Sequence, residues 1–179
     1  MDFTEKTVGQ AYHYKGRIIN LRVDEIILPN GKHASREVVE HPGGVCVAPL
    51  DEEGNLYFVR QFRYPYGEAL LELPAGKLEY GEDPAEAAVR ELREETGAVA
   101  GSFQSLGELY PSPGYCGEII TLYAATGLSF GETHPDADEF LSTEKIPLET
   151  AVQMVMAGEI KDAKTQVLVL KLWQKHTGS

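Results

Sequence analysis

The sequence predicts a mixed α+β protein with many strands and few helices. Runs rich in β-branched and aromatic residues, separated by turns that contain Gly and Pro, fill most of the first 130 positions. Helix signals are confined to three later segments. The 179 residues suit one domain with a small appendage, which we expect as a β-sheet appendage over 1–40 and a main domain over 41–179.

The N-terminal part predicts an antiparallel sheet. Residues 17–41 read as two strand-like runs around Pro29-Asn30-Gly31, a strong hairpin signal. An isolated hairpin is marginally stable in water. We therefore expect the first 40 residues to form a separate antiparallel sheet.

The main domain is predicted to hold a series of short strands. A polar turn with Gly54 separates the first two, and Pro74 interrupts the third. The Pro- and Gly-rich segment 111–117 is expected as an ordered loop between the last two. The predicted strand-like runs are 43–50, 55–64, 68–79, 103–110 and 118–127.

Three helices are predicted. Asp83 is a plausible N-cap, Pro84 suits the first helical position, and Gly97 suits the C-terminal end. A second helix is expected over 148–157 and a third over 164–175.

Composition and charge exclude several classes of function. The formal net charge of -12 repels nucleic-acid backbones and anionic membranes, so neither is expected as a partner. Cys46 and Cys116 form no metal or disulfide pattern and are expected as reduced, packed thiols. No apolar run reaches about 18 residues, and the polar first ten residues lack a signal-peptide layout. A cytoplasmic location is therefore expected.

Three carboxylates share one face of the first predicted helix. Glu91 precedes Glu94 by three positions and Glu95 by four, so like charges lie together at a cost in helix stability. Arg90 precedes Glu94 by four positions and can neutralise one charge. A solvated acidic surface is one explanation, and a hard divalent cation such as Mg²⁺ is the other.

The surrounding spacing favours the cation. The segment reads Gly76-x5-Glu82-x7-Arg90-Glu91-Leu92-x-Glu94-Glu95-x-Gly97-Ala98. It resembles the Nudix box, a loop–helix–loop signature, at every specified position. The resemblance implies an α/β/α sandwich with a mixed sheet, and hydrolysis of a nucleoside diphosphate linked to another moiety.

The resemblance also implies a set of metal ligands. By motif position, Glu91 and Glu95 look like ligands, Glu94 like a third ligand or a catalytic group, and the Ala75 carbonyl like a further ligand. Gly76 lets the backbone approach closely there. The cofactor implied is Mg²⁺, with Mn²⁺ as an alternative.

Two other box residues are assigned supporting roles. Arg90 would orient Glu94 or Glu91 and belongs to the catalytic group by resemblance. Glu82 is expected to shape the loop, with metal binding as the alternative.

Segments outside the box point to a substrate. Pro113 lies sixteen residues after Gly97, between Ser112 and Gly114, and resembles the ADP-ribose pyrophosphatase branch of the family. Residues 59–79 and the Asp-Ala-Lys-Thr run at 162–165 are similar to the same branch. The resemblance implies hydrolysis of ADP-ribose or a related ADP-sugar to AMP and ribose 5-phosphate. GDP-mannose, a dinucleotide, or a sensor that binds ADP-ribose without cleaving it are the alternatives.

The same resemblance implies substrate contacts. Arg63 would grip the diphosphate, since guanidinium donors match phosphate oxygens; Pro113 and Gly114 lie in the loop expected to recognise substrate. Glu72 and Glu118 would bind the adenosine or terminal ribose side or brace a metal, and an exposed position is the alternative for each.

Arg36 is implied to reach a partner's site, because this branch builds its pocket across a homodimer with swapped N-terminal sheets. A plain hairpin arginine is the other interpretation of this residue.

The acidic run near 136–139 is the expected source of the group that activates water. Glu139 is the choice by resemblance, with Asp138 retained as an alternative and a solvated acidic loop as the other explanation. His134 reads as an exposed loop residue. A final strand is expected over 140–147, with its register left open.

Overall fold

The computed structural model describes residues 2–133 and 140–178 and divides the chain into two compact units. Unit 1 comprises the residues up to Gly43 together with Tyr110–Ile119, and unit 2 comprises the remainder. Among the described residues, no helix has the length and apolar character needed to cross a membrane.

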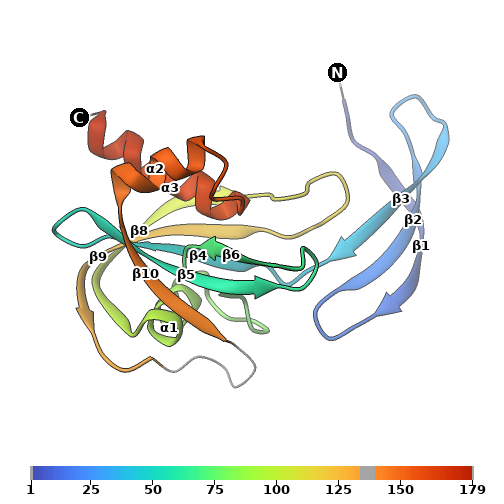
Figure 1. Cartoon of the computed structure of the whole chain (residues 1–179). Coiled ribbons are helices and arrows are strands. Elements are labelled where there is room, and N and C mark those ends of the chain that lie inside the picture. The colour runs from blue at the N-terminus through green and yellow to red at the C-terminus, as the bar shows by residue number, and fades with distance from the viewer. Residues whose placement is uncertain (1, 134–139, 179) are drawn as a thin grey trace. The chain divides into compact units, whose positions relative to one another are not determined.

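Unit 1 is built on a three-stranded antiparallel sheet in the order β1-β2-β3 (Figure 1). The predicted turn between β2 and β3 is confirmed, because the Gly31 N–H donates to the Leu28 carbonyl at 2.8 Å. The strands are β1 Lys6–Lys15, β2 Asn20–Ile27 and β3 His33–Glu40.

The loop Tyr110–Ile119 is attached to β3. The Val39 N–H donates to the Tyr115 carbonyl at 2.8 Å, and the Gly117 N–H donates to the Val39 carbonyl at 2.9 Å. Val39 and Cys116 thereby form a parallel bridge. The loop expected to recognise substrate is therefore fixed to the N-terminal sheet by backbone hydrogen bonds.

Unit 2 contains a mixed sheet, β7-β4-β9-β8, and an antiparallel sheet, β10-β5-β6. Strands β4 and β9 pair in parallel, and the other described pairs in these sheets are antiparallel. The elements are β4 Gly44–Pro49, β5 Asn55–Arg63, β6 Glu68–Glu72, β7 Ala75–Lys77, α1 Pro84–Thr96, β8 Ala98–Leu109, β9 Ile120–Phe130, β10 Leu141–Pro147, α2 Leu148–Met156 and α3 Ala163–Thr177.

The central strand β4 is buried on both faces and feeds two cores. Val45 and Val47 pack with Leu92 of α1, whereas Cys46 and Ala48 belong to the core that α2 and α3 cover. This split follows from the alternation of side chains along a strand. The mixed sheet therefore lies between α1 on one face and α2 with α3 on the other (Figure 1).

All three predicted helices and the predicted strands of the main domain are present. The break at Pro74 separates β6 from β7, as expected. The register that the sequence left open is now assigned: Leu141 of β10 lies opposite Gln61 of β5.

Candidate active site

Helix α1 begins and ends where its capping residues require. The Asp83 carboxylate accepts the Ala85 N–H at 2.8 Å, and Pro84 occupies the first turn. Gly97 has φ 69°, and its N–H donates to the Arg93 carbonyl. An added Cβ at Gly97 would lie 2.5 Å from the Gly131 carbonyl oxygen, so both conformation and space require glycine there.

Two box carboxylates lie on the buried face of α1, against β7. Glu91 is 8% exposed and Glu95 4% exposed. The Ala75 N–H donates to Glu95 Oε2 at 3.1 Å. A Cβ at Gly76 would lie 1.9 Å from Glu91 Oε1, so the strand approaches this carboxylate more closely than any side chain permits. The glycine of the box is thus required by contact with Glu91.

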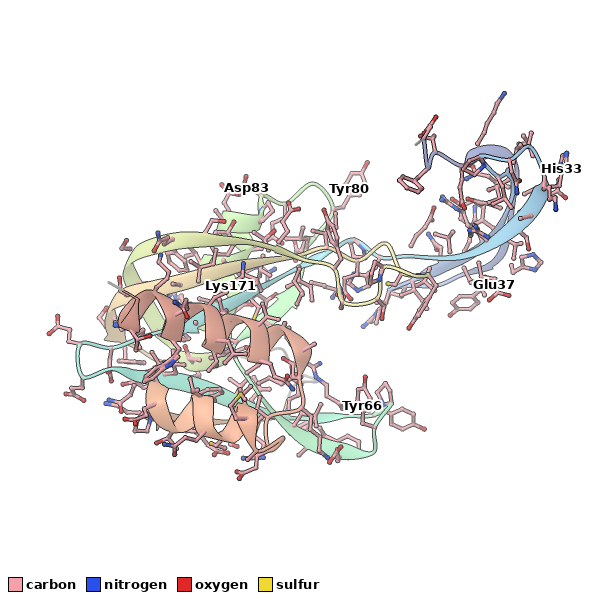
Figure 2. All side chains as sticks on the ribbon, turned by 90° about the horizontal axis from the view of Figure 1, so that it is seen from above. His33, Glu37, Tyr66, Tyr80, Asp83 and Lys171 are labelled. Carbon is pink, nitrogen blue, oxygen red and sulfur yellow. The ribbon has the colours of Figure 1, made fainter. Side chains whose placement is uncertain are left out.

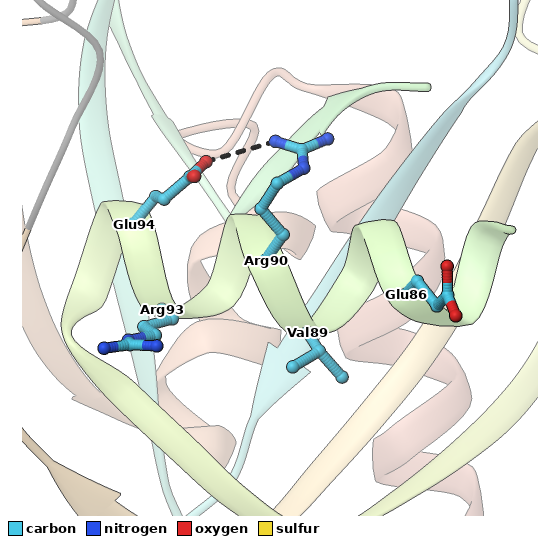
Figure 3. A pocket seen from close by; sticks show the side chains of 5 residues that line it. All are labelled: Glu86, Val89, Arg90, Arg93 and Glu94. Carbon is cyan, nitrogen blue, oxygen red and sulfur yellow. Dashed lines mark hydrogen bonds and ion pairs between the residues drawn. The ribbon is translucent and has the colours of Figure 1, made fainter. Parts of the chain in front are cut away.

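Arg90 forms hydrogen bonds with three acids of the box. Its guanidinium donates to Glu82 at 2.9 and 3.0 Å and to Glu91 at 2.7 Å. It also donates to Glu94 at 3.1 Å, the contact drawn in Figure 3. Hydrogen bonding to Glu82 is the largest influence that raises the Arg90 pKa above its usual value. The predicted pairing of Arg90 with Glu94 is therefore present.

Glu82 is tied into the loop before α1. Besides its bonds to Arg90, its carboxylate accepts the Glu79 N–H at 2.8 Å. These contacts are those of a residue that shapes the loop.

A shallow pocket of about 340 Å³ runs along the outer face of α1 (Figure 3). Its lining side chains follow helical spacing, and Arg90 and Glu94 are the box residues among them. The lining residues are Glu86, Val89, Arg90, Arg93 and Glu94. Glu94 is thus the box carboxylate that faces this pocket.

The donor atoms present fit a hard divalent cation. Glu91 and Glu95 supply oxygens on a buried face next to Ala75, and Mg²⁺ prefers oxygen ligands. Within residues 2–133 and 140–178, no group of three or more His, Cys, Asp or Glu side chains is arranged to hold a metal. A cation here would therefore rely on two carboxylates together with a backbone carbonyl, or on a rearrangement of Glu94 away from Arg90.

Arg63 and Glu72 lie together in a second charged cluster. Arg63 Nε and Nη2 donate to Glu72 Oε1 and Oε2, each at 2.7 Å. Lys164 Nζ donates to Glu72 Oε2 at 2.5 Å and to Asp162 Oδ1 at 2.9 Å. The Glu72 hydrogen bonds raise the Arg63 pKa, and the charges of Asp162 and Glu95 act in the same direction, which places the cluster near the box.

Sequence reasoning did not assign Asp162 and Lys164 to the site. Asp162 is the N-cap of α3, and Lys164 lies in the first turn. A cation near a helix N-terminus is unfavourable to the helix dipole. That misplaced charge was the available signal that Lys164 serves a contact outside its own helix.

The other predicted substrate residues belong to unit 1. Arg36 is on β3 and pairs with Glu5. Pro113 and Gly114 are exposed in the loop attached to β3, and Glu118 Oε1 lies 3.5 Å from His41 Nδ1. Their roles remain predictions.

The residues predicted to activate water lie outside those the structure describes. They are Glu139, its alternative Asp138, and His134.

Two family models match the chain. Residues 40–169 match the NUDIX domain, and residues 5–39 match the nucleoside diphosphate sugar hydrolase N-terminal domain. Together they span nearly the whole sequence.

Similar proteins carry more than one description. An ADP-ribose pyrophosphatase of Bacillus subtilis (strain 168) is 41% identical over 173 residues, which cover 96% of this chain and 94% of the relative. A methanol dehydrogenase activator of Bacillus methanolicus is 42% identical over 169 residues, 93% of this chain and 91% of the relative.

A solved structure described as an ADP compounds hydrolase superposes with a TM-score of 0.85 at 20% identity. The match covers 99% of this chain and 98% of that one, and it confirms the predicted fold.

Proposed function

The chain belongs to the Nudix family, and from that premise we propose that it hydrolyses the diphosphate bond of ADP-ribose, or of a related ADP-sugar, to AMP and ribose 5-phosphate or the corresponding sugar phosphate. The observation that carries the proposal is the buried pair Glu91 and Glu95 on α1, against a strand with no room for a side chain at Gly76. The description of the Bacillus subtilis relative supports the choice of ADP-ribose.

We propose Mg²⁺, with Mn²⁺ as the alternative, as the cofactor. Glu91 and Glu95, with the Ala75 carbonyl and Glu94, are the residues that would hold it. When bound, such a cation neutralises phosphate oxygens and makes water a better nucleophile. An anionic protein needs this charge, because a net charge of -12 repels a diphosphate.

The remaining roles belong to the chain itself. Arg63 binds the diphosphate, and Arg90 orients Glu91 and Glu94 through the bonds described above. Glu139 accepts the proton of the attacking water, a role carried over from the family resemblance.

We also propose that the active protein is a cytoplasmic homodimer, with Arg36 reaching the partner's site. Strand β1 supports the dimer, because apolar side chains along it and just after it are exposed within one chain. They are Val8 at 46%, Tyr12 at 45%, Tyr14 at 58% and Ile18 at 50%. A second copy that covers this sheet would remove them from water. Light scattering after gel filtration measures this, and a monomer across the micromolar range contradicts it.

A substrate panel tests the proposed function. Purified protein with Mg²⁺ is incubated with ADP-ribose, ADP-glucose, ADP-mannose, GDP-mannose and a dinucleotide, and products are followed by chromatography. We expect AMP from ADP-ribose at the highest kcat/KM. Absence of turnover of every ADP-sugar contradicts the assignment, and tight binding of ADP-ribose without turnover under any divalent cation indicates a sensor.

A further inference from the structure

The Glu72 carboxylate lies buried between two cations from different elements. Its side chain is 2% exposed, that of Lys164 is 12% exposed, and that of Arg63 is 36% exposed. Glu72 receives two hydrogen bonds from Arg63 and one from Lys164. An acid this deeply buried is tolerated only when its charge is paired and hydrogen-bonded.

The fold brings the three residues together in a defined way. Glu72 at the end of β6 lies opposite Val59 of β5, and Arg63 follows Val59 by four residues on the same strand face. Lys164 comes from the first turn of α3. That turn is fixed to β6, because the Leu73 N–H donates to Thr165 Oγ1 at 2.8 Å.

The charges in this cluster keep its side chains ionised. Burial alone would raise the Glu72 pKa, but the Arg63 hydrogen bonds and the Lys164 charge outweigh it and lower the pKa. Burial would lower the Lys164 pKa, and the charges of Asp162 and Glu72 outweigh it and raise the pKa. Glu72, Lys164 and Arg63 are therefore ionised near neutral pH.

The contact with Glu72 uses one side of the Arg63 guanidinium. Nε and one N–H of Nη2 face Glu72, which leaves Nη1 and the second N–H of Nη2. Within residues 2–133 and 140–178, Nη1 has no hydrogen-bond partner in the protein. The remaining edge has the donor geometry that a phosphate accepts.

We propose that Glu72 and Lys164 are positioning residues, which hold Arg63 so that its free edge binds the diphosphate of the substrate. This inference rests on the proposed function, since it takes a diphosphate as the ligand. It assigns Glu72 a contact with Arg63 in place of a contact with adenosine or ribose, because Glu72 is 2% exposed and both of its oxygens already accept hydrogen bonds from the protein. It also makes the start of α3 part of the substrate site.

A double-mutant cycle tests whether Glu72 acts through Arg63. The variants are Glu72→Gln, Arg63→Ala and their combination, and the probe is an ADP-ribose analogue with a methylene in place of the bridging oxygen. Its Kd with Mg²⁺ is measured by calorimetry. We expect Glu72→Gln to weaken binding about tenfold in the wild-type background and by less than about twofold in the Arg63→Ala background.

A matched control is present on the same two segments. Lys161 and Glu68 form an exposed ion pair, at 2.9 Å, between the residues just before α3 and the start of β6. Glu68 lies directly opposite Arg63 in the β5–β6 register, but its carboxylate pairs with Lys161. Lys161→Met should leave the Kd within about twofold of wild type, because it removes an exposed ion pair that does not include Arg63 or Glu72.

A double variant controls for loss of folding. Glu72→Gln leaves Lys164 with one buried partner fewer, whereas Glu72→Gln combined with Lys164→Met removes both charges and keeps the net charge. This double variant should remain folded by circular dichroism. It should still bind the analogue about tenfold more weakly than wild type, because Arg63 has lost the carboxylate that fixes its side chain.

The outcomes separate the inference from the proposed function. If wild type neither binds the analogue nor cleaves ADP-ribose, the proposed function fails and the inference fails with it. If wild type does both, but Glu72→Gln weakens binding equally in the two backgrounds, only the inference is overturned. The same holds if the Lys161→Met control weakens binding as much as the double variant of Glu72→Gln with Lys164→Met.

Discussion

Replacing Gly76 by alanine tests the close approach of β7 to α1. The added Cβ would lie 1.9 Å from Glu91 Oε1 and 2.0 Å from its Cδ. Ordinary contact begins at 3.4 Å, so the carboxylate or the strand must move by about 1.5 Å. A movement of that size breaks the 2.7 Å bond from Arg90 to Glu91.

Two contributions determine the expected loss of stability. A hydrogen bond between charged groups contributes about 1.5–3 kcal/mol, and overpacking costs about 1–3 kcal/mol. Since 1 kcal/mol shifts the melting temperature of a protein this size by roughly 2–4 °C, we expect a decrease of about 5–20 °C. Displacing a catalytic group by about 1 Å can lower the rate about 100-fold, and we expect kcat/KM to fall at least that far.

The assay is kcat/KM for ADP-ribose with Mg²⁺, together with a thermal melt of the same preparation. Gly101→Ala is the matched control, because its Cβ would meet its nearest neighbour at 3.5 Å, an ordinary contact. A Gly76→Ala variant that retains kcat/KM within threefold of wild type would refute the reasoning.

Three further outcomes are expected. Glu95→Gln should lower kcat by orders of magnitude with a melting temperature close to wild type, because an amide oxygen can still accept the Ala75 N–H; unchanged turnover contradicts the role in metal binding. Thr165→Val should cost about 1–3 kcal/mol in urea unfolding, because the buried Leu73 N–H loses its acceptor; an unchanged midpoint shows that another acceptor takes over. Folding lowers the Glu72 pKa from 4.5, so the ionised carboxylate stabilises the folded protein fully above pH 4.5, and this stabilisation is lost as the pH falls through the lowered pKa. The free energy of unfolding of wild type should therefore fall more steeply below pH 4.5 than that of Glu72→Gln. Parallel curves contradict this.

The local elements were predictable where single residues determine them. Asp83, Pro84 and Gly97 define α1 through a cap, a preset φ and a left-handed end. Pro74 likewise separates β6 from β7 because it lacks a backbone donor. Strand β1 was not predicted as a separate element, because its apolar side chains face outward within the chain and give no inward-facing alternation.

Contacts between distant segments were not predictable in the same way. The parallel pairing of β4 with β9 joins residues more than 70 positions apart, and no local pattern specifies such a register. The residues of the site were predictable to the same extent: local spacing was informative and long-range contacts were not. The spacing along one helix placed Glu91 beside Glu95, whereas the approach of Lys164 to Glu72 depends on how α3 docks on β6.

The attachment of residues 110–119 to β3 has a consequence for protein engineering. Exchanging the first 43 residues for those of a relative keeps this attachment only if the new strand has the register of β3 and a residue other than proline at position 39, because the Val39 backbone N–H and carbonyl hold Tyr115 and Gly117. Taking both segments from the same parent meets these conditions. Residues 1–43 and 110–119 form one compact unit, so they would be exchanged together, while the box and its helix come from the other parent.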